Sequence, residues 1–225
     1  MRIVFCVYRD WALNVAKRVL KNNTTHKIKV IESNEDFINS SQSIVDNSDL
    51  LVFIGWSWII PSSITENILC LGMHPSDLPL YRGGSPLQHQ IINGVIDTKI
   101  SLITLSEKLD AGDIWMKEPI SFLGDNMNQI LRRLEDSTVN LIEGFISVYP
   151  NISPVKQTIS EGTYYSRRKP SDGRLLPDDF REKSLKELHN FMRCLTNPYP
   201  NSFLEDEFGN RLYFESVRFE EGNKI

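Results

Sequence analysis

Continuous apolar runs rich in β-branched residues alternate with amphipathic stretches along the first two thirds of the chain. Such a run is typical of a strand buried on both faces, whereas apolar residues three and four positions apart indicate a helix. The predicted strands are residues 3–7, 27–31, 50–55, 69–73, 100–105 and 114–120. The predicted helices are residues 12–20, 36–45, 87–92 and 127–149. This alternation predicts a Rossmann-like, doubly wound α/β fold with a mostly parallel sheet.

The character of the sequence changes near Pro150. Residues 164–177 are rich in Arg, Pro, Gly and Ser, which indicates a long surface loop. A short helix over residues 185–195 and a strand over 212–219 are predicted after it. We therefore expect a Rossmann-like domain over residues 1–158 and a small α+β subdomain (loop, helix and hairpin) over residues 159–225.

Composition narrows the class of protein. The formal net charge of −4 argues against a dedicated nucleic-acid binder, which usually carries a basic excess. The three cysteines have no metal-ligand spacing and are expected to be reduced, structural thiols. The sequence begins with a predicted strand instead of a leader peptide, and no apolar run is long enough to span a bilayer. These features predict a soluble, cytoplasmic protein without a membrane partner.

Two ionisable residues follow predicted strands at the sheet edge where open parallel sheets bind ligands. His74 comes directly after the strand at residues 69–73, and Asp110 follows the strand at 100–105. Both could therefore face one crevice. Each residue also has an ordinary structural interpretation, as a hydrogen-bonded histidine or as an aspartate that caps a helix or turn.

These two residues lie in two motifs, MHPSDLPLYRGGSP at residues 73–86 and LDAGDI at 109–114. Asp110 stands 36 residues after His74, and with this separation the two motifs resemble the hydrolase-like formyltransferase family. That family includes methionyl-tRNA formyltransferase, glycinamide ribonucleotide formyltransferase and the sugar N-formyltransferases. The resemblance covers about residues 1–175 and implies that residues 1–158 form a catalytic domain.

The resemblance implies that a formyl group moves from N10-formyltetrahydrofolate to an amine. The attack creates a tetrahedral oxyanion, and one proton must leave the amine while another reaches N10 of the leaving folate. By resemblance, His74 stabilises the oxyanion and takes part in proton transfer, which an imidazole can do near neutral pH. Asp110 would orient His74 or its water and favour the charged imidazole.

One position departs from the family pattern, which normally reads Asn-x-His and uses the asparagine amide to hold the oxyanion. The equivalent position here is Gly72. Loss of an oxyanion donor can cost roughly a hundred-fold in rate. Either Ser85, Gln88 or His89 replaces the donor, or the enzyme is slow, or the protein only binds its ligands.

The donor pocket is predicted by the same resemblance. The segment WSWIIP at residues 56–61 resembles the family segment that holds the pterin, although its apolar side chains could equally be core. The predicted folate contacts are Trp58, Ile59, Ile60, Leu105 and Asp110.

The C-terminal region favours a small acceptor. Its segments TYYSRRKPSDG at 163–173 and LTNPYP at 195–200 resemble the sugar N-formyltransferases. Acidic runs at 205–207 and 220–221 argue against a tRNA-reading enzyme, which would carry a longer basic domain. We therefore expect the amine of a nucleotide-linked aminodeoxysugar, used for surface polysaccharide, as the acceptor. The expected contacts, with the arginines as diphosphate partners, are Arg9, Ser76, Arg82, Gly83, Gly84, Ser85, Gln88, Tyr164, Arg167 and Arg168.

Other interpretations stay open. Arg167 and Arg168 could belong to a solvated basic loop. The runner-up activity is that of methionyl-tRNA formyltransferase, and a hydrolase that releases formate would use related machinery. A folate or nucleotide-sugar binding protein without turnover is a further alternative because of Gly72. Family analogy also implies a homodimer.

Overall fold

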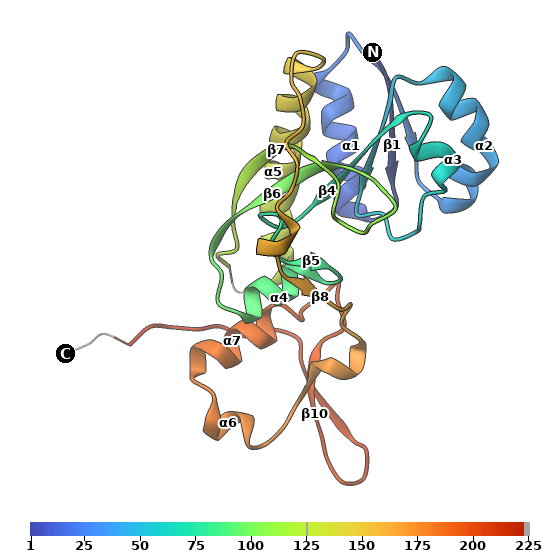
Figure 1. Cartoon of the computed structure of the whole chain (residues 1–225). Coiled ribbons are helices and arrows are strands. Elements are labelled where there is room, and N and C mark those ends of the chain that lie inside the picture. The colour runs from blue at the N-terminus through green and yellow to red at the C-terminus, as the bar shows by residue number, and fades with distance from the viewer. Residues whose placement is uncertain (125, 223–225) are drawn as a thin grey trace. The chain divides into compact units, whose positions relative to one another are not determined.

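The computed structural model describes residues 1–124 and 126–222. Its main feature is a six-stranded sheet in the order β2-β1-β3-β4-β6-β7 (Figure 1). Its strands are β1 (Arg2–Val7), β2 (Lys27–Ile31), β3 (Leu50–Ile54), β4 (Leu69–His74), β6 (Asp97–Thr104) and β7 (Ile114–Ser121). The pairs β1–β2, β1–β3 and β3–β4 are parallel, whereas β4–β6 is antiparallel. The predicted α/β fold with a mostly parallel sheet is confirmed.

Helices α1 (Asp10–Asn22), α2 (Asn34–Asn47), α4 (Pro86–Ile92) and α5 (Met127–Val148) form where helical spacing was found. The short helix α3 (Ser62–Thr65) was not predicted, because four residues are too few to show a helical period. Figure 1 shows α1 beside α5, and Arg18 of α1 forms an ion pair with Asp136 of α5. Ser33 caps the N-terminus of helix α2, and its hydroxyl accepts a hydrogen bond from the Asp36 amide.

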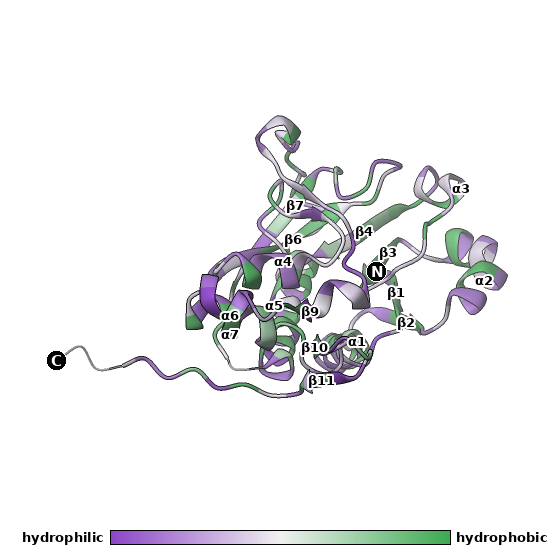
Figure 2. Cartoon of the chain, turned by 90° about the horizontal axis from the view of Figure 1, so that it is seen from below, coloured by the Kyte–Doolittle hydropathy of each residue, from purple (hydrophilic) through white to green (hydrophobic). Residues whose placement is uncertain are grey.

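The strands are apolar because the sheet is buried on both faces. Side chains alternate along β1, so that Val4 and Cys6 point to one face and pack with residues of α2 and α3. Figure 2 shows the same pattern as green strands beside helices that are partly purple. The cluster on this face contains Val4, Cys6, Ile31, Phe37, Ile44, Leu51, Phe53, Ile64 and Cys70. This packing fixes the strand ends that carry the candidate site.

The described chain divides into two compact units. Unit 1 comprises residues 1–82, 99–120 and 134–164, and unit 2 comprises residues 83–98, 121–133 and 165–225, of which 125 and 223–225 lie outside the described residues. The division differs from one boundary at residues 158 and 159, because segments far apart in sequence join the same unit. The domain assignment from the sequence stays a prediction.

Unit 2 contains a three-stranded sheet in the order β11-β10-β9 and a helix packed beside it. The strands are β9 (Arg174–Leu175), β10 (Ser202–Glu205) and β11 (Arg211–Phe214), and the helices after residue 165 are α6 (Asp179–Glu182) and α7 (Leu185–Arg193). Its small core joins Leu175, Leu188 and Met192. The Arg193 guanidinium is buried and donates to the Phe122 and Gly124 carbonyl oxygens. These bonds satisfy a charge that would otherwise be costly to bury.

Two predictions about this region were wrong. Residues 164–177 are not one loop: they contain strands β8 (Tyr164–Tyr165) and β9 and the 3-10 turn at Pro170–Gly173. β8 pairs with β5 (Arg82–Gly83), and Leu175 is buried in the small core. The strand predicted over 212–219 ends at Phe214, and its partner β10 was missed. Strands of two to four residues carry too little alternation to be found by pattern.

The three cysteines are buried. Burial raises the pKa of Cys70 and of Cys194 to about 12, and it also raises the pKa of Cys6. These thiols therefore stay protonated at neutral pH and act as small apolar side chains. None of the helices in the described part of the chain is long and apolar enough to cross a membrane.

Candidate active site

His74 is the last residue of β4 and belongs to unit 1. β4 lies between β3 and β6, and His74 pairs with Ser101 of β6. The strand is anchored on both sides, so the histidine is carried by a rigid element. Such support is what a precisely positioned reacting group requires.

The imidazole of His74 has a defined contact on each nitrogen. Nε2 lies 2.8 Å from the carbonyl oxygen of Tyr81, and Nδ1 lies 3.4 Å from Oδ1 of Asp110. A carbonyl oxygen can only accept, so Nε2 must carry a hydrogen in this arrangement. The two side chains are 8% and 14% exposed, respectively. The structure therefore brings together the imidazole and the carboxylate that the sequence predicted to meet.

Asp110 sits in a tight loop between β6 and β7. Its φ of 50° is left-handed, which is uncommon for a residue with a side chain. The amide of Gln157 donates to the carbonyl oxygens of Asp110 and Gly112, at 3.1 and 2.6 Å. A Cβ added to Gly112 would lie 1.7 Å from the Thr104 carbonyl oxygen. Only glycine therefore allows this loop to approach the end of β6 as closely as it does.

Gly72 and His74 are two residues apart in β4, so their Cα substituents point to the same face of the sheet. A Cβ added to Gly72 would lie 2.5 Å from Cδ2 of Leu105. Leu105 packs against the apolar cluster of Cys70 and Phe53. The space where the family pattern places an amide is thus filled by a leucine side chain. This contact depends on the register between Gly72 and Ile103 and was not predicted.

Of the predicted donor-pocket residues in unit 1, Trp58, Ile59 and Ile60 follow β3, whereas Leu105 and Asp110 follow β6. Ile60 and Leu105 are partly buried against the apolar cluster, whereas Ile59 is 94% exposed and Trp58 is 41% exposed. Trp58 stands edge-on to Tyr8 and Trp56, with ring centroids 4.5 and 4.9 Å apart. The Trp56 Nε1 atom is buried without a hydrogen-bond partner among the described residues. The partly exposed Trp58 ring and the exposed Ile59 side chain form an apolar surface that a flat heteroaromatic ligand could cover.

The predicted acceptor contacts in unit 1 have different surroundings. The Arg9 guanidinium lies over the Tyr8 ring, 4.9 Å from its centroid. The Ser76 hydroxyl is buried and donates to the Leu80 carbonyl oxygen, as expected of a residue that shapes a turn. Nε of Arg82 is buried without a hydrogen-bond partner in the described part of the chain. The Tyr164 side chain is exposed. Contact of these side chains with a substrate stays a prediction.

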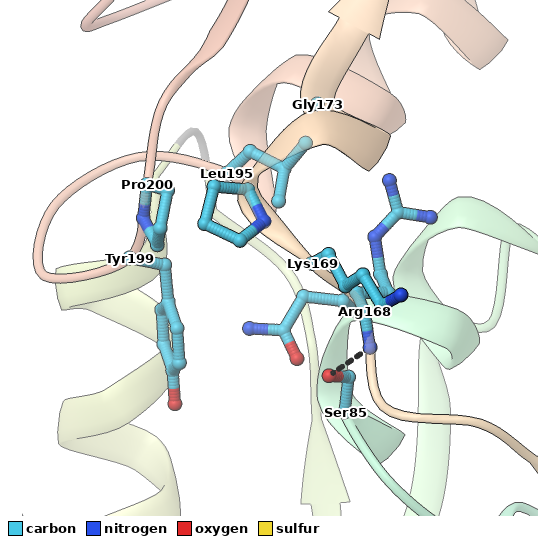
Figure 3. A pocket seen from close by; sticks show the side chains of 9 residues that line it. Ser85, Arg168, Lys169, Gly173, Leu195, Tyr199 and Pro200 are labelled. Carbon is cyan, nitrogen blue, oxygen red and sulfur yellow. Dashed lines mark hydrogen bonds between the residues drawn. The ribbon is translucent and has the colours of Figure 1, made fainter.

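In unit 2 a small hollow of about 70 Å3 lies beside Ser85, Arg168 and Tyr199 (Figure 3). Its other lining residues are Gln88, Lys169, Pro170, Gly173, Leu195 and Pro200. The Ser85 hydroxyl accepts a hydrogen bond from the Arg168 amide at 3.1 Å, drawn as the dashed line. A hollow of this size holds a few waters and is far smaller than a typical ligand pocket.

The remaining predicted residues of unit 2 are engaged with one another. A Cβ on Gly84 would lie 2.3 Å from Cα of Arg167, so this glycine permits contact between two backbone segments. Gly83 has a φ of 94°. Nε2 of His89 donates to the Ser166 carbonyl oxygen, and burial is the main reason why the pKa of His89 is lowered. Ser85, Gln88 and His89 stay candidates for an oxyanion donor.

Several residues of the site carried no sequence signal. Gln157 is an isolated polar residue, the contact of Thr163 with Tyr81 does not follow from the 163–173 segment to which it belongs, and the Tyr81 contact to His74 uses the backbone. Lys117 forms an ion pair with Asp77 and donates to the Leu78 carbonyl oxygen at 2.7 Å. These groups hold the loops around His74 and Asp110 through contacts that depend on the fold.

The arrangement suits a proton transfer coupled to attack on a carbonyl carbon. A buried imidazole can exchange a proton, and an adjacent carboxylate can hold its ring and balance a positive charge. This combination serves general acid-base catalysis, and comparison with known proteins identifies its class.

Residues 12–146 match the family model described as formyl transferase, which is more than half of the chain. The methionyl-tRNA formyltransferase of Lachnospira eligens is 34% identical over 164 residues, which cover 70% of this chain and 50% of that protein. The chain therefore belongs to the formyl transferase family. It spans about half the length of the first curated relatives that it matches.

Solved structures agree with this assignment. Methionyl-tRNA formyltransferase from Clostridium thermocellum is 30% identical with a TM-score of 0.84, over 100% of this chain and 95% of that one. A 4-N formyltransferase from Francisella tularensis is 19% identical with a TM-score of 0.78, over 98% of each chain. At 19% identity the second likeness shows the fold alone.

Proposed function

We propose that this chain transfers a formyl group from N10-formyltetrahydrofolate to the amine of a nucleotide-linked aminodeoxysugar. The observation that carries the proposal is the buried pair of His74 and Asp110 at the end of β4, in a chain of the formyl transferase family. Imidazole and carboxylate are suited to the proton movements that formyl transfer requires.

In this mechanism Nδ1 of His74 is the nitrogen that exchanges a proton, since Nε2 is committed to the Tyr81 carbonyl oxygen. The amine attacks the formyl carbon, forming a C–N bond and an oxyanion. His74 takes part in moving the proton from the amine toward N10 of the leaving folate. Asp110 holds the ring and balances its charge at 3.4 Å. The oxyanion then collapses, and the bond to N10 breaks.

The folate would be held by the residues after β3. Trp58 and Ile59 present apolar surface to solvent, and Ile60 and Leu105 continue this surface into the apolar cluster. The pterin ring is flat and partly apolar, so contact with these side chains would remove water from both surfaces. These residues, with Asp110, are the proposed donor contacts.

Charge supports a small acceptor. The net charge is −4, and Glu205, Glu207 and Glu220 in unit 2 are solvent-facing or partly so. Recognition of tRNA relies on a basic surface that neutralises phosphates. Arg9 and Arg82 in unit 1 and Arg167 and Arg168 in unit 2 are instead proposed as candidate diphosphate contacts, by bidentate hydrogen bonds.

The second candidate acceptor is the methionyl group of charged initiator tRNA. It is favoured by the names of the more similar relatives, which are methionyl-tRNA formyltransferases at 30–34% identity. A homodimer and a cytoplasmic location stay predictions for either acceptor.

The acceptor can be tested by incubating the chain with N10-formyltetrahydrofolate and two sets of acceptors. One set contains dTDP-, UDP- and GDP-linked aminodeoxysugars, and the other contains charged initiator tRNA. A formyl mass increment on a sugar, without one on the tRNA, is the expected result. Formylation of the tRNA alone would contradict the sugar assignment, and formate release without either product would indicate a hydrolase.

The contact between Gly72 and Leu105 gives a separate prediction. Gly72→Asn alone should lower the free energy of unfolding by about 1–3 kcal/mol, since the new side chain meets Cδ2 of Leu105. Combined with Leu105→Ala, it should fit and raise kcat about ten-fold or more by supplying an oxyanion donor. Urea unfolding and steady-state kinetics measure both effects, with Leu105→Ala alone as the control. A combined variant that folds well but is no faster would show that another group already holds the oxyanion.

A further inference from the structure

We propose that Thr163 is a positioning residue of the active site, which acts on His74 through the backbone of Tyr81. Thr163 belongs to unit 1 and lies far from His74 in sequence. The inference rests on the proposed function only where activity is measured. Its structural part, the proton on Nε2 of His74, can be tested without any turnover.

His74 contacts the loop that follows β4. Nε2 of His74 donates to the Tyr81 carbonyl oxygen at 2.8 Å. This bond decides which nitrogen of the neutral ring carries the hydrogen and how the ring is turned. The position of the Tyr81 peptide therefore controls which ring nitrogen faces Asp110.

Tyr81 has an unusual backbone conformation. Its φ of 56° is left-handed, a conformation that residues with side chains adopt only when neighbouring contacts hold them. Thr163 supplies such contacts from the adjacent segment. Its Oγ1 accepts a hydrogen bond from the Tyr81 amide at 2.8 Å, and its carbonyl oxygen accepts one from the Arg82 amide at 3.0 Å. The peptide groups on both sides of Tyr81 are thus tied to one threonine.

The segment that contains Gly162 and Thr163 lies close to the loop after β4. The Thr163 amide donates to the Pro79 carbonyl oxygen at 3.2 Å, and a Cβ added to Gly162 would lie 2.4 Å from the same oxygen. The backbone contacts keep the two segments together whatever side chain stands at 163. Replacing the hydroxyl therefore removes one bond to the Tyr81 amide and leaves the pairing in place.

Buried serines hold the other side of the loop. The Ser101 hydroxyl donates to the Ser76 carbonyl oxygen at 2.8 Å and accepts from the Leu78 amide at 3.2 Å. Those bonds fix residues 76–78, and the Ser76 hydroxyl also donates to the Leu80 carbonyl oxygen, on the same peptide group as the Tyr81 amide. Thr163 is exposed, so its substitution leaves the core intact. In contrast to the buried serines, Thr163 is the exposed side chain whose substitution frees the Tyr81 amide, and with it the left-handed φ that sets the direction of the Tyr81 carbonyl, while the backbone bond to Arg82 stays.

The direct test is a long-range 1H–15N spectrum of protein labelled at histidine, recorded where the free imidazole is mostly neutral. The chain has four histidines, and His74→Asn identifies the signals of His74. We expect hydrogen on Nε2 in the wild type, in Thr163→Ser and in the control Thr158→Val, which alters an exposed threonine of the same segment. Thr163→Val should shift the Nε2 signal toward the unprotonated value. A wild-type ring with hydrogen on Nδ1 alone, or an unchanged signal in Thr163→Val, overturns the proposal.

Kinetics add a second readout. With the acceptor found active, Thr163→Val should lower kcat about ten-fold with an unchanged KM, because the ring is misoriented but the ligands still bind. Thr163→Ser should restore the rate. An equal rate in the valine variant would overturn the positioning role. If no acceptor is formylated but the nitrogen signal still shifts, the proposed function fails while the link from Thr163 to His74 stands.

Discussion

Replacing His74 by asparagine is expected to lower kcat for formyl transfer by at least about a hundred-fold, the range lost with a general acid-base group. The imidazole is the proton-exchanging group nearest to Asp110, at 3.4 Å, and an amide cannot take up a proton near neutral pH. The loss should appear in kcat with little change in the binding of tetrahydrofolate, because His74 is not among the proposed donor contacts and Trp58, Ile59 and Ile60 lie after β3. Steady-state kinetics and folate titration separate the two effects.

His26→Asn is the matched control for this substitution. His26 comes just before β2, at the amino-terminal end of that strand. Strands β2, β1, β3 and β4 are parallel and His74 ends β4, so His26 lies at the opposite end of the parallel strands from His74. The control should keep the wild-type rate. A His74→Asn variant that retains most of its activity would remove the histidine from the mechanism. A wild-type protein that binds folate but formylates nothing would instead support a binding protein without turnover.

Gly112→Ala should have the largest effect on stability, lowering the free energy of unfolding by about 3 kcal/mol. The added Cβ would stand 1.7 Å from the backbone oxygen of Thr104, and a backbone atom cannot move aside as the end of a side chain can. The loop must shift as a whole, and Asp110 shifts with it. Activity should therefore fall together with stability.

Urea unfolding followed by tryptophan fluorescence measures the effect of Gly112→Ala. All four tryptophans belong to unit 1, which also contains the loop, so their signal reports the relevant unit. The control is Gly222→Ala, since a Cβ there meets no atom of the described part of the chain within 4 Å. An unchanged urea midpoint for Gly112→Ala would mean that the loop does not approach Thr104 in solution.

Most of the main sheet could be predicted from the sequence, because buried parallel strands are continuous apolar runs. The meeting of His74 and Asp110 was also predicted, but on the premise that both strands end at one edge of the sheet. β6 runs antiparallel to β4, so it is the loop after β6 that brings Asp110 to His74. β10 and β9 could not be found, because they are too short to show a pattern. The discontinuous units were missed because they depend on which distant segments pack together.

The finer parts of the site depend on contacts that have no sequence signature. The Tyr81 carbonyl oxygen is present whatever residue stands at 81, so its bond to His74 could not be anticipated. Gln157 reaches the Asp110 loop through the fold. The substitution at Gly72 was visible in the sequence, but its filling by Leu105 follows from strand register.

The acceptor is the point at which the motifs and the relatives differ. The segments at 163–173 and 195–200 and the acidic residues of unit 2 favour a nucleotide-linked sugar. The relatives at 30–34% identity are named for tRNA. Because donor chemistry resides in unit 1 under either proposal, the role of His74 and Asp110 does not depend on the choice.

A double-mutant cycle on His74→Asn and Asp110→Asn tests the central claim most directly. Two groups that work as one unit lose their function together, so the effects of their substitutions are not additive. We predict that kcat of the double variant is no lower than that of the slower single variant. Losses that multiply would show that the imidazole and the carboxylate act independently, and would contradict the account.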